Sequence, residues 1–240
     1  MGQCHGSANK KAADALLAAA PKKPTGLAVP EPDLNKALLN SALSVVADQL
    51  IAQKKNITVV VVGGAVNTIL GNRASTHDVD FFNAKLAPKE LTALDAAAKK
   101  ACSIVTVKPP LQEGWFNNRT IVFIPTALRV PLTDEAIAQN DVLFAKKSPD
   151  KKAGLTVFAA PWHYAFCCKV DRFAGSGLIQ GQAYDVQDAV FYIQKHMAKK
   201  GVKEVKMAEI KVWFTRFRLK WNPSVEIVLN QIKAANVPIV

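Results

Sequence analysis

The sequence predicts a mixed α/β (α+β) fold, in which a small mixed sheet with flanking helices is followed by a helical C-terminal part. The apolar run from Ile57 to Val62 has the composition of a buried strand. Amphipathic and proline-opened helical segments alternate with strand-like segments up to about residue 160. The pattern is mainly helical after that point. We therefore expect a tail over residues 1–33, a core over 34–160 and a helical region over 161–240 that packs on the core.

The individual elements follow from two periodicities. Apolar residues at three-and-four spacing predict helices, and short β-branched runs predict strands. In chain order we expect a helix over 33–54, a strand over 57–62, a helix over 65–70, a strand over 78–82, a helix over 88–98, strands over 103–107 and 119–124 joined by a turn, a helix over 134–140 and strands over 142–145 and 155–159. Helices starting at Pro161 and Tyr184, and an amphipathic helix around Trp213, complete the chain.

Two short motifs carry the strongest functional signal. Gly63 and Gly64 follow the buried strand, so the backbone there can turn sharply and approach a ligand closely. The amides at the start of the next helix would then favour a phosphate. Asp78 and Asp80 are two apart on an expected strand, so both carboxylates lie on one face. Paired carboxylates together with substrate phosphates suit Mg²⁺ or Mn²⁺.

In this order, the motifs resemble the nucleotidyltransferase superfamily, whose polymerase-beta-like core has a strand, a Gly-Gly turn, a helix and an Asp-x-Asp strand. The segment from Gly63 to Arg73, followed by Asp78-Val79-Asp80, is similar to the toxin-like and CCA-adding branches. The resemblance implies metal-dependent transfer of a nucleoside monophosphate from an NTP to an unknown acceptor. Asp78 and Asp80 would be the metal ligands and catalytic carboxylates.

The chain departs from this family at two places. Asn67-Thr68 stands where the CCA-adding branch has an Arg-Asp pair, so we do not expect tRNA CCA addition. The family also supplies a third carboxylate from a later strand, and the expected strands over 103–107 and 120–124 contain no acid. The acids left to substitute for it are Glu113, Asp134, Glu135 and Asp141. Two classes therefore stay open: an active transferase, and an inactive protein of the same fold that serves as a structural, self-assembling or binding module.

Several residues are candidates for contacting the nucleotide. Arg73, Ser75 and Thr76 lie in the loop between the two motifs. Arg73 either clamps a triphosphate bidentately or forms an ion pair with Asp78 or Asp80. By the resemblance to toxin-like transferases, Lys169 and Arg172 could contact substrate phosphates. The alternative for these two is a structural ion pair with Asp185 or Asp188.

The formal net charge of +12 predicts anionic partners such as RNA, nucleotides or an anionic membrane. Residues 195–220 hold nine Lys or Arg against two Glu. This segment is either the solvated face of a helix or a nucleic-acid surface. The second alternative would need exposed aromatic side chains for base stacking.

The first residues raise the question of lipidation. Gly2 is a candidate for myristoylation and Cys4 for palmitoylation, and Lys10-Lys11 would add attraction to anionic lipid, although Gly6 stands where Ser or Thr is preferred. No secretory apolar block is seen. We expect a cytoplasmic protein, membrane-associated only through such a tail, with a homo-oligomer as a further candidate assembly. The cysteines lack zinc-ligand spacing, so Cys167 and Cys168 are expected to be buried thiols.

Overall fold

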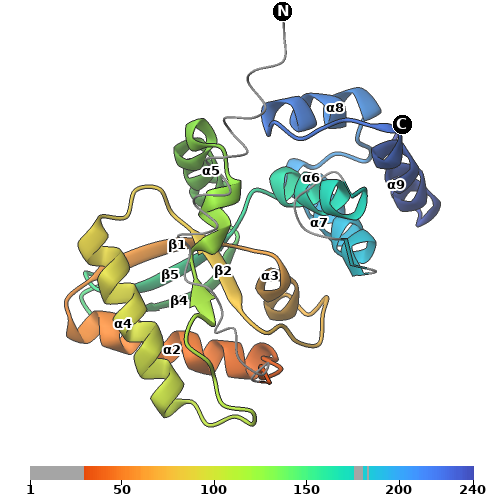
Figure 1. Ribbon diagram of the computed structural model, residues 1–240. Coiled ribbons are helices and arrows are strands. Elements are labelled where there is room, and N and C mark those ends of the chain that lie inside the picture. Colours follow the sequence, from red (N-terminus) through yellow and green to blue (C-terminus); the bar gives the residue numbers. More distant parts are fainter. Residues whose placement is uncertain (1–29, 176–180, 183) are drawn as a thin grey trace, which may run out of the picture.

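A computed structural model describes residues 30–175, 181–182 and 184–240. Its centre is a five-stranded mixed sheet with the order β3-β2-β1-β5-β4. The strands are β1 (Asn56–Val62), β2 (Val79–Phe82), β3 (Phe116–Asn117), β4 (Val142–Lys147) and β5 (Gly154–Ala159). Figure 1 shows helices α6 to α9 gathered beside this sheet. The mixed α/β fold predicted from the sequence is confirmed.

Strand β1 is the middle of the sheet, as its valine run predicts. It pairs with β2 in the antiparallel sense and with β5 in the parallel sense. Val59, Val60 and Val61 are fully buried, because helices cover both faces of the sheet. At the two edges, β3 runs parallel to β2, and β4 runs antiparallel to β5.

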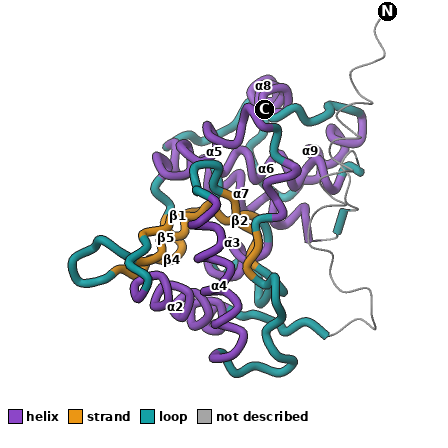
Figure 2. The backbone as a smooth tube through the Cα atoms, turned by 60° about the vertical axis from the view of Figure 1, so that its left-hand side comes forward, coloured by secondary structure: helices purple, strands orange, loops and turns teal. Residues whose placement is uncertain are grey.

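Most helices of the core form where the amphipathic pattern predicts them. They are α2 (Lys36–Ala52), α3 (Gly64–Ile69), α4 (Pro88–Ile104), the 3₁₀ helix η1 (Arg119–Phe123) and α5 (Thr126–Gln139). The side chain of Asn35 caps α2 by accepting a hydrogen bond from the Leu38 amide at 3.0 Å. Helices α2 and α4 pack together over one face of the sheet, while α3 lies on the side of the C-terminal helices (Figures 1 and 2).

The C-terminal region consists of α6 (Trp162–Phe173), α7 (Tyr184–Lys200), α8 (Met207–Arg216) and α9 (Pro223–Ala234). Trp213, Phe214 and Phe217 are buried in the interior of this region. Cys167 is also buried, and burial raises the pKa of its thiol well above the ordinary value. None of the helices among the described residues is long and apolar enough to cross a membrane.

Two predicted strands are wrong, and one predicted helix starts earlier than expected. Residues 103–104 form the last turn of α4 instead of opening a strand, and residues 105–107 belong to no strand. The segment over 119–124 is mostly the 3₁₀ helix η1, so no hairpin forms there. The strand beside β2 is instead the short Phe116–Asn117. The helix expected over 134–140 begins earlier, at Thr126, and contains Pro131.

Candidate functional site

The sheet brings the two sequence motifs together. Strand register places Asp80 opposite Val62, the residue directly before the Gly63-Gly64 turn. Gly63 has φ +75°, a left-handed conformation that glycine adopts without steric cost. Val79 is fully buried, whereas Asp78 and Asp80 on either side of it are half-buried. This alternation of burial is the one expected when both carboxylates lie on the face opposite Val79, although Asp78 itself precedes β2.

The loop after α3 folds back over Gly64. A Cβ atom on Gly64 would lie 2.5 Å from Thr76 Oγ1 and 3.2 Å from Arg73 Nη1, so any side chain here would displace the Thr76 hydroxyl. The Thr76 hydroxyl donates to the Asp78 carbonyl at 3.3 Å. Thr76 and Arg73 thus lie beside the turn. Ser75 does not share this contact, because its hydroxyl bonds to Asp33 at 3.1 Å.

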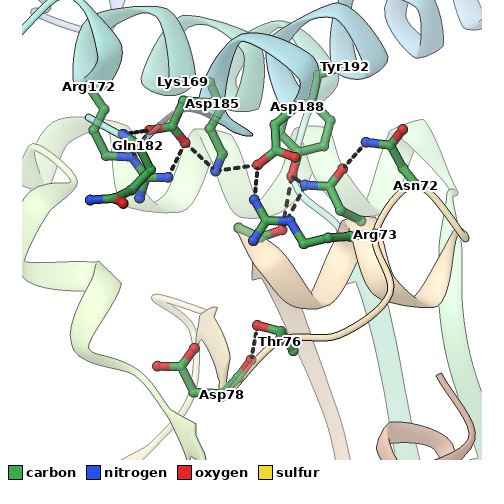
Figure 3. A network of polar contacts seen from close by, with 12 residues as sticks. Asn72, Arg73, Thr76, Asp78, Lys169, Arg172, Gln182, Asp185, Asp188 and Tyr192 are labelled. Carbon is green, nitrogen blue, oxygen red and sulfur yellow. Dashed lines mark hydrogen bonds and ion pairs between the residues drawn. The ribbon is translucent and has the colours of Figure 1, made fainter. Parts of the chain in front are cut away.

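Arg73 belongs to a larger polar network with side chains from α6 and α7 (Figure 3). Its Nη2 lies 2.6 Å from Asp188 Oδ2, and Lys169 Nζ lies 2.6 Å from the same oxygen. Lys169 also donates to Asp185 at 2.9 Å, and Arg172 Nε donates to Asp185 at 2.8 Å. The structure therefore places Lys169 and Arg172 in the ion pairs that were one of their two predicted roles. The partner shown for Arg73, Asp188, was not among those considered from the sequence.

The charged side chains of this network are largely buried, so they interact with one another more strongly than they would in water. The side chains of Asp185, Asp188 and Lys169 are 0%, 2% and 7% exposed. Burial alone raises the pKa of Asp185, but the hydrogen bond from Arg172 and the charge of Lys169 outweigh it and lower that pKa below its ordinary value. Asp185 is therefore ionised at neutral pH. Three cations in this network share two carboxylates.

Two tyrosines that the sequence analysis did not select complete the site. The Tyr192 hydroxyl donates to the carbonyl of Gly63 at 3.0 Å and accepts from the Asn67 amide at 2.8 Å. Tyr184 lies under the Arg73 guanidinium, with Cζ 3.8 Å from the ring centroid. Tyr192 is one helical turn beyond Asp188, so α7 contacts the Gly63–Arg73 segment at both ends. The four-residue spacing between Asp188 and Tyr192 was the only feature of the sequence that could have pointed to Tyr192.

Asp78 and Asp80 are the candidate metal ligands. Mg²⁺ in phosphate-transfer sites commonly uses one or two carboxylates and takes its other oxygens from phosphates and water, so this pair fits the ion. No group of three or more potential His, Cys, Asp or Glu ligands occurs within the described ranges. Figure 3 shows Asp78 apart from the Arg73–Asp188 network, on the β2 side of the site.

The acids considered as a third carboxylate have partners elsewhere. Asp141 pairs with Lys199 at 3.3 Å, and Glu113 lies 3.8 Å from Lys99. Asp134 pairs with Lys85 and Glu135 with Arg216. On the strand next to β2, the residue opposite Asp80 is Asn117. An amide therefore occupies the neighbouring position. The lipidation candidates Gly2 and Cys4 lie outside the described residues.

Comparisons of the chain with models of protein families, with curated proteins and with solved structures find no match.

Proposed function

We propose that the turn at Gly63-Gly64 and the carboxylates of Asp78 and Asp80 form a nucleoside triphosphate site that works with Mg²⁺ or Mn²⁺. The observation that supports it most directly is the strand register, which sets Asp80 beside the residue that precedes the turn. The reaction proposed is transfer of a nucleoside monophosphate to an acceptor hydroxyl. This is the reaction that the order of the motifs implies.

Each group has a defined role in this proposal. Asp78 and Asp80 would hold the metal ion, which supplies positive charge to the triphosphate oxygens and to the leaving pyrophosphate. The loop side chain Arg73 lies beside Gly64, where its guanidinium can neutralise phosphate charge. Lys169 and Arg172 add positive charge through their network with Arg73 and the two aspartates. They are auxiliary phosphate contacts in the proposal.

A second candidate function is nucleotide binding without transfer. It is favoured by Asn117, because the strand adjacent to Asp80 presents an amide where the resemblance implies a carboxylate. The Asn117 side chain is also engaged. Its amide nitrogen donates to the Gly114 carbonyl at 3.1 Å, and its oxygen accepts from the Arg119 amide at 3.0 Å. Such an amide cannot take a proton from an attacking hydroxyl.

The partners named from the sequence remain proposals. Residues 195–220 present most of their Lys and Arg side chains on the surface, which supports RNA or another anion as acceptor. A cytoplasmic location, a homo-oligomer and membrane attachment through lipidated Gly2 and Cys4 are further predictions from the sequence.

The test is to incubate the full chain with each labelled NTP and Mg²⁺ or Mn²⁺, alone and with total RNA. The Asp78→Ala/Asp80→Ala double variant is compared with Asp48→Ala/Asp95→Ala, which removes two acids from exposed ion pairs elsewhere. Transfer that is lost only in the first variant supports the enzyme. Metal-dependent NTP binding without transfer supports the second candidate. If the wild-type chain neither binds nor transfers any NTP, both are wrong.

A further inference from the structure

Exposed aromatic side chains are scarce on this protein. Among the residues that the structure describes, only Phe123 and Tyr184 are exposed aromatics, each at 41%. The aromatic residues of α8, which the sequence suggested as candidates for base stacking, are buried in the C-terminal region. Phe123 and Tyr184 are therefore the most accessible rings for a nucleobase, whereas Trp221 is half-buried.

Only one of these two rings is surrounded by positive charge. The Arg73 guanidinium carbon lies 3.8 Å from the centroid of the Tyr184 ring. Lys169 Nζ and the Arg172 guanidinium carbon lie over the same ring at 5.5 Å and 5.9 Å. Within the described ranges, no cation is found over the ring of Phe123. An exposed aromatic ring among cations is the arrangement that binds bases and phosphates together.

The charge balance around Tyr184 favours an anionic ligand. Three cations share the carboxylates of Asp185 and Asp188, which leaves one positive charge in excess. A phosphate near Arg73 would balance this excess.

The position of Tyr184 is fixed at the start of α7. Immediately after it, Asp185 accepts a hydrogen bond from the Gln182 amide at 2.8 Å, and the Asp185 amide donates to the Gln182 carbonyl at 2.9 Å. Asp185 is also bound by Lys169 and Arg172. The ring therefore stands next to a residue that four hydrogen bonds and ion pairs hold in place.

We infer that the Tyr184 ring is the stacking surface for the base of the nucleoside triphosphate, with the phosphates directed toward Arg73 and the Asp78–Asp80 pair. This inference rests on the proposed function and adds the location of the base to it. Stacking accepts any base, because every base presents a π face. The site would therefore bind nucleotides more tightly than the triphosphate group alone.

The inference is tested by calorimetric titration of the full chain, in the presence of Mg²⁺, with ATP and separately with inorganic triphosphate. Tyr184→Leu and Tyr184→Gln remove the ring, Tyr184→Phe keeps it, and Phe123→Leu is the matched control at the other exposed aromatic. Removing the ring is expected to weaken ATP binding roughly ten-fold. Triphosphate binding by these variants, and ATP binding by Tyr184→Phe and Phe123→Leu, should equal those of the wild type.

Thermal unfolding confirms that each variant is folded before titration. Unchanged ATP affinity in both ring-removing variants would overturn the inference, as would equal losses for ATP and triphosphate, because the tyrosine would then act only through Arg73. Loss in Tyr184→Phe would also overturn it by assigning the effect to the hydroxyl. In these cases the proposed function survives. A wild-type chain that binds neither probe overturns both.

Discussion

Asp188 on α7 binds Arg73, which lies 115 residues earlier in the chain, at 2.6 Å. The same carboxylate oxygen contacts Lys169 of α6. One buried carboxylate therefore joins the loop after α3 to two helices of the C-terminal region. The loop that borders the Gly63-Gly64 turn is therefore joined to α7 directly and to α6 through this shared oxygen.

Replacing Asp188 with alanine should leave Arg73 and the buried Lys169 without this partner. Loss of one member of a buried ion pair costs about 3 kcal/mol in free energy of unfolding. The control is Asp134→Ala, whose pair with Lys85 is about half exposed and should contribute less than about 1 kcal/mol. Urea unfolding at pH 7 measures both. Equal effects would show that the network adds no more than a surface pair.

Replacing Tyr192 with phenylalanine should destabilise the turn. The change removes the hydroxyl that contacts Gly63 and Asn67, leaving a buried carbonyl and amide without that partner. The expected loss is about 1–3 kcal/mol in free energy of unfolding. Tyr184→Phe, at an exposed ring, should change it by less than about 0.5 kcal/mol. Chemical unfolding of the two variants compares them, and similar values would contradict the role assigned to Tyr192.

Replacing Gly64 with alanine tests the close approach of the loop. The new Cβ would meet Thr76 Oγ1 at 2.5 Å, and overpacking of this kind costs about 1–3 kcal/mol. Thr76→Ala added to Gly64→Ala removes the clashing oxygen and should recover part of that loss. A double-mutant cycle of unfolding free energies measures the coupling. Strict additivity of the two changes would mean that these residues do not touch.

The buried histidines should make the protein sensitive to acid. Burial, together with the charges of His196, Arg216 and Lys200, lowers the pKa of His163 to about 3, and burial and Lys200 lower that of His196 to about 4. Glu135 lies 3.7 Å from His163 but does not reverse the shift. Both folded-state pKa values lie below the unfolded value of 6.5, so the unfolded chain binds more protons in acid.

Stability should therefore be full above pH 6.5 and fall as the pH decreases toward 4, by up to about 1.4 kcal/mol per pH unit for each histidine. The measurement is the free energy of unfolding at several pH values between 7 and 4. His163→Phe/His196→Phe keeps two rings but removes the titrating groups, so its slope should be shallower. An unchanged slope would assign the acid sensitivity in this range to other groups. Asp185, whose pKa is lowered from 3.8, would add its share mainly at still lower pH.

Local patterns in the sequence predict much of the core, because they depend on neighbours within one element. The valine run of β1, the proline at the start of α4 and the order of the two motifs are of this kind. The β-branched segments over 103–107 and 119–124 fail because strand formation also needs a partner. The outer edge of β2 pairs with Phe116–Asn117, and the alanine-rich α4 continues through Ile104.

In the candidate site, too, local patterns predict some residues and fail to predict others. Gly63, Gly64, Asp78 and Asp80 were predicted from local motifs, and the strand register places Asp80 opposite Val62, the residue before the turn. The Arg73–Asp188 pair joins residues too far apart for any local spacing to indicate it. Tyr184 and Tyr192 were missed because exposure and burial, which set their roles, depend on the folded chain.

The parallel pairing of β1 with β5 has a consequence for folding. Residue Asn56 aligns with Gly154, so the centre of the sheet joins segments almost a hundred residues apart. During synthesis, the uncharged segment Ile57–Val62 would emerge long before β5 can cover its edge. Segments with high β-propensity and no charge readily pair with other chains as long as their own partner strand is missing. The protein should therefore be most prone to aggregation before residue 159 has been made.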